Sequence, residues 1–215
     1  MAARIPMRLR ALSLLILLPA LCGCAGDSSD YGRLSNMIYN QVVGADDSVP
    51  RDKAAAVPYA TIGVQIGGGP QSMLVLATST GAERMWLAGT DVAITTREGR
   101  VVQTVGLPQN LNGIQLLSDT PVTGEYKYDL ANPMRYGVFV RCTKREIGPE
   151  TIEILGSKIQ TRHIAEDCYA PGIGWSFTNE FWRDPKTDYA WKSVQNVNPD
   201  GDEIEIDVFR PEDVE

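Results

Sequence analysis

Histidine is almost absent from this 215-residue sequence, in which His163 is the only one. It follows Thr161 and Arg162 in an alternating segment, where an exposed strand histidine is the default interpretation. The nucleophile-elbow motif Gly-x-Ser-x-Gly is also missing. Both absences argue against a serine hydrolase, although sequence alone leaves open a Ser-His-Asp arrangement built from distant residues.

Positive charge is scarce too. The chain has 20 Lys and Arg against 27 Asp and Glu, a net charge of −7 at pH 7. Removal of an N-terminal segment with three arginines would leave 17 basic side chains against 27 acidic ones, a net charge of −10. A nucleic-acid partner requires a basic footprint, so we expect none. The acidity also opposes close approach to anionic lipid or polymer.

Long hydrophobic runs are missing as well. The most apolar stretch, residues 11–21, contains Pro19 and is shorter than the ~20 residues that a membrane-spanning helix needs. Three arginines precede it, and Leu21-Cys22-Gly23-Cys24 ends it, which is the order of a secretory signal. The ending resembles the lipobox of bacterial lipoproteins. This resemblance implies a signal peptide over residues 1–23 and an acylated Cys24 at the mature N-terminus.

The lipobox resemblance also predicts a location. One acyl chain holds a protein at a membrane only marginally, so stable anchoring takes several chains, and we expect palmitate among them. Enterobacterial lipoproteins that stay in the inner membrane usually carry Asp after the acylated Cys, whereas Ala25 and Gly26 follow Cys24 here. We therefore expect an outer-membrane anchor with the folded domain facing the periplasm.

Two cysteines remain once the signal peptide and the lipidated residue are set aside. In an oxidising periplasm, Cys142 and Cys168 are expected to form a disulfide. Such a loop stabilises a fold by roughly 3 to 4 kcal/mol in the chain-entropy model. Two cysteines and the distant His163 cannot complete a four-ligand zinc site, so we expect no metal and no cofactor.

Residues 24–58 are predicted to be a tether that contains one short helix. The polar stretch 26–29 is expected to be flexible. Leu34, Ile38 and Val42 then recur at four-residue spacing, between a capping Asp30 and a terminating Gly44. We expect this apolar stripe to dock on the folded domain. An interfacial membrane helix is the alternative, and the single cation Arg33 makes it the weaker one.

Residues 59–215 carry the pattern of an all-β domain. Short runs rich in Val, Ile, Thr and aromatics alternate with Gly, Pro, Asn and Asp. In the run 204–209, Ile204, Ile206 and Val208 share one face, opposite acidic residues. Short connections require antiparallel pairing, which predicts a single antiparallel β-sandwich or open barrel. The predicted strands are 61–66, 73–78, 92–97, 101–105, 136–145, 158–164, 175–182, 191–197 and 204–209.

Aromatic residues concentrate between positions 175 and 191. Trp175, Phe177 and Phe181 share one strand face, which is what a core requires. Trp182 falls on the opposite face and is the better candidate for an exposed contact. We expect Trp182, Tyr189 and Trp191 to offer a contact surface for a partner protein or for glycan, with ordinary core packing as the competing interpretation.

No set of catalytic residues is predicted. Glu166 and Asp167 are strand neighbours and should point to opposite faces, and the pair Glu180 and Asp184 carries little weight in so acidic a chain. The glycines at 67–69 lack the Gly-Lys-Ser/Thr of a phosphate-binding loop.

Several short stretches, taken in order, resemble the YjbF/GfcB family of bacterial outer-membrane lipoproteins, encoded with exopolysaccharide and group 4 capsule systems. The resemblance implies an all-β periplasmic domain and brings no catalytic residues. The stretches are Val57-Pro58-Tyr59-Ala60, Gly69-Pro70-Gln71 with Met73 to Ala77, Trp86, Thr96 to Val102, Gly106-Leu107-Pro108, Asp184-Pro185, Trp191-Lys192-Ser193 and Phe209-Arg210-Pro211.

The predicted function is therefore that of an outer-membrane lipoprotein that serves polysaccharide production or secretion as a non-catalytic accessory component. Its expected partners are the membrane, through the N-terminal lipid, and other exopolysaccharide-export proteins. A glycan-binding module and a periplasmic polysaccharide-processing enzyme are the two alternatives.

Overall fold

The computed structural model describes residues 48–212. The predicted signal peptide, Cys24 and the expected helix at 30–44 lie outside the described residues. Among the residues described, no helix is long and apolar enough to cross a membrane. One short helix, α2 (Arg51–Ala56), precedes the strands, and sequence analysis did not predict it.

Twelve strands follow α2 in the chain. They are β1 (Thr61–Ile66), β2 (Ser72–Thr80), β3 (Glu83–Ala88), β4 (Val92–Arg97), β5 (Arg100–Val105), β6 (Leu111–Asp119), β7 (Thr123–Ala131), β8 (Met134–Ile154), β9 (Ser157–Ala170), β10 (Trp175–Arg183), β11 (Ala190–Gln195) and β12 (Ile204–Arg210).

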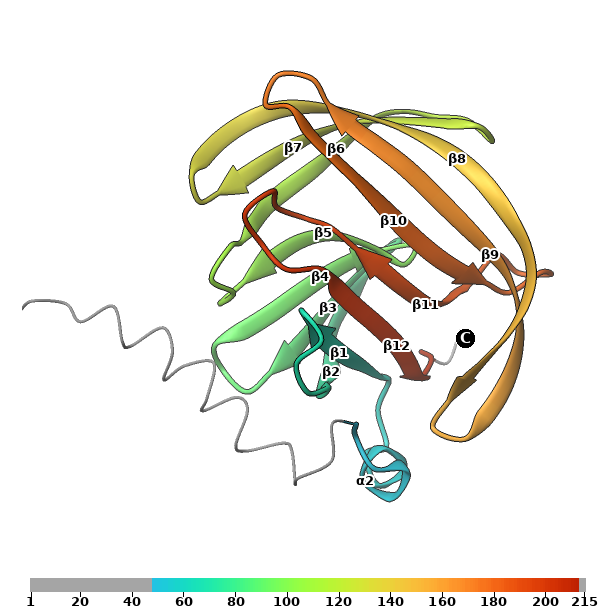
Figure 1. The fold of residues 1–215 in the computed structure, drawn as a ribbon. Helices are drawn as coiled ribbons and strands as arrows, with labels where there is room; N and C mark the ends of the chain where they lie inside the picture. The colour runs from blue at the N-terminus through green and yellow to red at the C-terminus, as the bar shows by residue number, and fades with distance from the viewer. Residues whose placement is uncertain (1–47, 213–215) are drawn as a thin grey trace, which may run out of the picture.

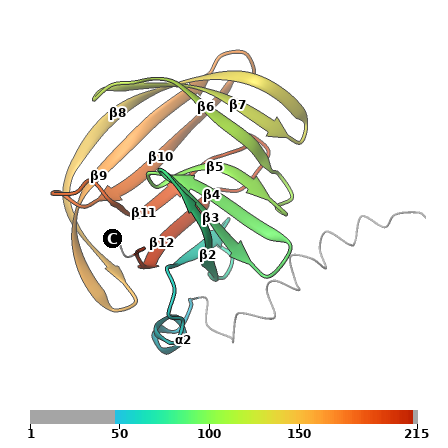
Figure 2. The same cartoon turned by 180° about the vertical axis from the view of Figure 1, so that it is seen from behind.

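All twelve strands belong to one antiparallel sheet that curls on itself. The order is β5-β4-β3-β2-β1-β12-β11-β10-β9-β8-β7-β6, so β1 pairs with β12 and the first and last parts of the domain are joined in the middle of the sheet. Figure 1 shows the curl, and Figure 2 shows the same strands from behind. The open barrel, one of the two predicted architectures, is confirmed.

The barrel is not closed by a backbone ladder between its two edge strands, β5 and β6, within residues 48–212. Side chains bridge the seam instead. Leu111 N of β6 donates to Thr104 Oγ1 of β5 at 2.8 Å, and within the β5–β6 connection Leu107 N donates to Asn110 Oδ1 at 3.0 Å. These bonds satisfy backbone donors that would otherwise face the gap.

The tight turn between β4 and β5 follows from its sequence. Glu98 and Gly99 have φ values of 52° and 84°, the left-handed pair that a two-residue hairpin turn requires. A Cβ at position 99 would also lie 2.4 Å from the Cβ of Ala190. Gly99 is therefore required both by the turn and by the close approach of the first residue of β11.

The barrel interior is filled by alternating side chains. In β12, the predicted inward residues Ile204, Ile206 and Val208 are buried, and they join one continuous core. Gln195 also points inward, where it accepts from Val101 N at 3.0 Å and donates to Gly99 O at 2.8 Å. This side chain ties β11 to β5 across the barrel.

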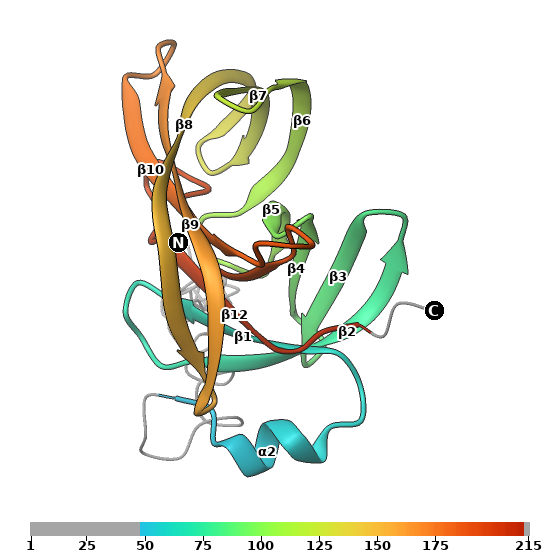
Figure 3. The same ribbon diagram turned by 90° about the vertical axis from the view of Figure 1, so that its right-hand side faces the viewer.

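Three strands were missed by sequence analysis, and β8 and β9 were predicted much too short. β3, β6 and β7 were not predicted, although Tyr126, Tyr128 and Leu130 of β7 alternate inward as a strand should. The long strand β8 runs through Gly148 and Pro149, which normally mark a break, because a bulge there absorbs the irregularity. Its hairpin with β9 extends down to α2, as Figure 3 shows.

Candidate functional site

A cavity of about 810 Å³ lies at one end of the barrel. Its floor consists of inward-facing residues such as Ile62, Ser193 and Ile206, and its rim consists of the β2–β3 turn, the β4–β5 turn, the β10–β11 connection and the chain after β12. In an antiparallel barrel these connections share one end, where the arrows of β10 and β12 finish in Figure 1. We call this space the barrel-mouth cavity. Barrel mouths are common ligand sites, and the volume is in the range of about 300 to 1,000 Å³ typical of such sites.

Three aromatic side chains line the barrel-mouth cavity. Trp86 is buried and donates from Nε1 to Thr96 Oγ1 at 2.9 Å, which fixes the ring. Tyr189 and Trp191 meet edge to face, with ring centroids 5.1 Å apart. Tyr189 remains 37 % exposed, yet burial raises the pKa of its phenol to about 12. The wall is therefore rigid, aromatic and partly open.

Charged groups on the rim are held by one another. Arg84 Nε lies 2.7 Å from Glu212 Oε2, which fastens the chain after β12 to the β3 side of the mouth. Arg183 donates to Glu98 O at 3.1 Å and to Asp188 O at 2.9 Å. These contacts fix two guanidinium groups and the Glu212 carboxylate around the cavity.

The β10–β11 connection is built on Asp184. Its Oδ1 accepts from Lys186 N at 2.8 Å and from Thr187 N at 2.9 Å, and these backbone bonds lower the pKa of the carboxyl. The turn carries Tyr189 and Trp191 into place. Asp184-Pro185 is thus a turn signal in the sequence, and the turn that it forms positions the aromatic side of the cavity.

Two of the three predicted contact residues, Tyr189 and Trp191, line this cavity, and the third does not. Trp182 lies on the opposite face as expected, but it is only 7 % exposed, so the expectation of an exposed contact was wrong. The tip of the β8–β9 hairpin brings Ile152 and Ile154 over the outer face of β10, where they bury the indole. Sequence analysis missed this cover because it ended the β8 strand at residue 145.

His163 was expected to be an exposed strand histidine, which was also wrong. Its side chain is 13 % exposed, and its ring stacks on Trp182 with centroids 4.4 Å apart. Glu150 Oε2 lies 3.0 Å from His163 Nδ1 and accepts from Trp182 Nε1 at 2.9 Å. The group holds the β8–β9 hairpin against β10.

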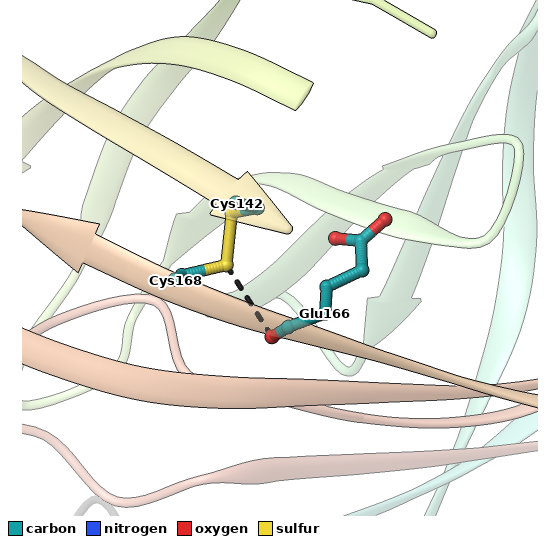
Figure 4. A group of neighbouring side chains, drawn as sticks. All are labelled: Cys142, Glu166 and Cys168. Atoms are coloured by element: carbon teal, nitrogen blue, oxygen red, sulfur yellow. Dashed lines mark hydrogen bonds between the residues drawn. A yellow bond between two sulfur atoms is a disulfide. The ribbon is translucent and has the colours of Figure 1, made fainter. Parts of the chain in front are cut away.

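The predicted disulfide is present between Cys142 and Cys168, which lie directly opposite each other on β8 and β9. Both are buried, and Figure 4 shows the nearby Glu166, whose backbone oxygen is 3.5 Å from Cys168 Sγ. These three residues are close enough to share a metal ion. The two sulfurs are bonded to each other, however, and the Glu166 carboxylate pairs with Arg100, so the group has no free ligand set.

The ion pair between Arg100 and Glu166 crosses the barrel interior. The Arg100 guanidinium also lies 4.6 Å from the centroid of the Tyr126 ring and 5.2 Å from that of Phe181. Burial alone would lower the pKa of Arg100, but the Glu166 carboxylate together with Tyr128 and Tyr126 outweighs it and the pKa is raised. Burial raises the pKa values of Tyr126 and Tyr128 as well. Sequence analysis correctly expected Glu166 and Asp167 to diverge, but it gave no partner for Glu166.

The fold and the cavity define a class of protein, a nearly closed antiparallel β-barrel with an aromatic and charged cavity at its mouth. The chain belongs to the family described as group 4 capsule polysaccharide lipoprotein gfcB, YjbF, whose model matches residues 34–209. The family predicted from the sequence is thereby confirmed.

Relatives and a solved structure agree with this assignment. The chain is 24 % identical over 191 residues to the uncharacterised lipoprotein YjbF of Escherichia coli K12, covering 83 % of this chain and 86 % of that one. It is 22 % identical over 178 residues to the uncharacterised lipoprotein GfcB of the same strain, covering 77 % and 83 %. The crystal structure of the hypothetical lipoprotein YmcC from E. coli K12 has the same fold, with a TM-score of 0.66 at 21 % identity over 87 % of this chain and 97 % of that chain.

Several of the stretches that carried the sequence resemblance meet at the barrel-mouth cavity. They come from five of those stretches. The residues in question are Trp86, Thr96, Glu98, Gly99, Asp184, Trp191, Lys192, Ser193 and Pro211.

Proposed function

We propose that this protein is an outer-membrane lipoprotein that acts as a non-catalytic accessory component of capsule or exopolysaccharide production or secretion. The observation that carries the proposal is the match of residues 34–209 to the group 4 capsule polysaccharide lipoprotein family. The two E. coli K12 relatives are also named lipoproteins.

The membrane part of the proposal rests on the N-terminal sequence. Cys24 follows a lipobox-like ending, and Ala25 and Gly26 are not the residues that retain enterobacterial lipoproteins in the inner membrane. Several acyl chains on Cys24 anchor the protein firmly. The folded domain then faces the periplasm, within reach of export proteins that pass polymer through it.

Three of the four carboxylates that line the cavity, those of Asp184, Asp188 and Glu212, support a binding role rather than hydrolysis. A glycosidase needs one carboxylic acid with a raised pKa beside a second carboxylate. The pKa of Asp184 is lowered, the opposite of what a general acid requires. Glu212 and Asp188 are engaged by Arg84 and Arg183, so each is committed to holding the rim.

A strain that lacks the gene, complemented with wild type or with Cys24→Ala, tests the proposal. Surface polysaccharide is assayed in each strain, and the native lipidated protein is recovered from its own membranes with the proteins bound to it. We expect polymer to fall in the deletion strain, to return with wild type, and export proteins to co-purify. Normal polymer in the deletion strain contradicts the proposal, and so does polymer cleavage by the purified protein.

A further inference from the structure

We infer that the barrel-mouth cavity is a binding site for neutral sugar residues of a polysaccharide. The inference rests on the proposed function only for the source of the polymer. Binding itself is argued from the shape, the aromatic wall and the polar groups of the cavity.

Aromatic side chains give the cavity its affinity for a sugar ring. The apolar C–H face of a pyranose packs on flat aromatic rings, which bury large areas with little loss of side-chain freedom. Tyr189 and Trp191 brace each other edge to face, and the Asp184 turn fixes both. The 37 % exposure of Tyr189 leaves part of its ring for a ligand.

Unmatched polar groups in the wall give the cavity its selectivity for hydroxyl groups. Trp191 Nε1 is buried and has no hydrogen-bond partner among residues 48–212. The indole contributes to the lowered pKa of the Asp184 carboxyl as a weak hydrogen-bond donor, whose geometry falls outside that of a normal bond. A hydroxyl can accept from an indole and donate to a carboxylate at once, so one sugar hydroxyl satisfies both groups. A buried donor without a partner costs free energy, which a ligand of this kind recovers.

The charges of the lining favour a neutral ligand. Three cationic and four acidic side chains line the cavity, so neither sign dominates. Arg84 and Arg183 are paired with Glu212 and Asp188, and Lys192 is paired with Glu205. An anionic sugar would have to break one of these pairs to reach a cation, whereas hydroxyls bond to groups that stay paired. Because the rim groups are already held in place, little side-chain conformational entropy is lost on binding.

Calorimetric titration of the full lipidated chain in detergent tests the inference. The probe is a mixture of oligosaccharides released by mild acid from the strain's own surface polysaccharide, and dextran oligosaccharides serve as an unrelated glycan. Three variants are compared with wild type: Tyr189→Ala, Trp191→Phe and, as a matched control, Tyr136→Ala, whose ring is exposed on β8 away from the cavity.

We expect wild type to bind the released oligosaccharides and Tyr189→Ala to bind them about 3- to 10-fold more weakly, the loss of one stacking contact. Trp191→Phe keeps a ring and loses the Nε1 donor, and it should weaken binding by a similar factor. Tyr136→Ala should bind as wild type does. Circular dichroism and thermal melts establish that each variant is folded, and Trp191→Phe serves if Tyr189→Ala is not.

Two results overturn the inference: wild type that gives no heat with the released oligosaccharides, or folded cavity variants that bind as wild type does. Either result, together with polymer loss in the deletion strain, leaves the accessory function standing and removes only the site. The opposite combination is binding that depends on Tyr189 and normal polymer in the deletion strain. It would support the binding site and contradict the accessory function.

Discussion

Arg100 of β5 and Glu166 of β9 form an ion pair inside the barrel, with side chains that are 12 % and 5 % exposed. The two residues are far apart in sequence and lie on strands that are not neighbours in the sheet. Their pairing holds the β5 edge against the opposite wall, beside the Gln195 contact that does the same from β11. The cavity rim at Glu98 and Gly99, one turn away, depends on this placement.

Arg100→Met should destabilise the fold by about 3 to 5 kcal/mol, because it leaves the Glu166 carboxylate buried and unpaired. Guanidinium chloride unfolding at pH 7 measures the loss. The matched control is Arg145→Met, which removes an exposed pair with Asp167 and should cost less than about 1 kcal/mol. Equal losses of unfolding free energy in the two variants would show that the interior pair stabilises the fold no more than the exposed pair does.

Reduction of the Cys142–Cys168 disulfide should lower the free energy of unfolding by roughly 3 to 4 kcal/mol in the chain-entropy model. The bridge is buried, so reductant should act slowly on the folded protein and quickly once denaturant opens it. Thiol labelling with mass spectrometry, with and without denaturant, follows the reaction. Free thiols at both positions in protein exported by the cell would contradict the bridge.

Alkaline pH should destabilise the barrel through the buried Tyr126 and Tyr128 and the partly exposed Tyr189. Their pKa values are raised in the folded state, for Tyr189 to about 12, so the folded chain keeps protons that the unfolded chain releases above about pH 10. This contribution to stability is complete below about pH 10 and is lost as pH rises through the folded pKa. Unfolding curves between pH 9 and pH 12 should show the decline, and Tyr189→Phe should make it shallower. If stability declines with pH as steeply in Tyr189→Phe as in wild type, the Tyr189 phenol is solvated in the folded protein and does not contribute to the decline.

Trp182→Ala should cost about 3 to 5 kcal/mol, since the indole is buried between β10 and the β8–β9 hairpin. Trp182→Phe, which keeps most of the volume but loses the bond to Glu150, should cost much less. Urea unfolding compares the two variants. If Trp182→Ala instead loses partner or glycan binding and keeps its stability, Trp182 is a surface contact residue and not a core residue.

Cys24→Ala should abolish lipidation and release the protein into the soluble periplasmic fraction. Metabolic labelling with palmitate and membrane fractionation check this, and Cys22→Ala serves as a control that leaves Cys24 in place. Palmitate in the Cys24→Ala variant would mean that the lipobox was misread.

The sequence was sufficient where the determinants are local. Alternation placed Ile204, Ile206 and Val208 in the core, because successive strand residues point to opposite faces. Gly99 favours a tight turn after residue 97, because glycine adopts a positive φ without steric cost. The pairing of Cys142 with Cys168 was available from a count of the cysteines. The family followed from the order of short motifs.

Only the tertiary structure decided which faces are covered and which distant residues meet. Trp182 is buried because the tip of the β8–β9 hairpin folds over it, and no local sequence pattern around Trp182 predicts that cover. The partner of Glu166 lies across a barrel whose curl sets the distance between β5 and β9. The cavity likewise joins Trp86 to the β10–β11 connection and to Glu212, because an antiparallel sheet that curls on itself brings alternate connections to the same end. Local chemistry thus determined most strands and turns, and the curl of the sheet determined the site.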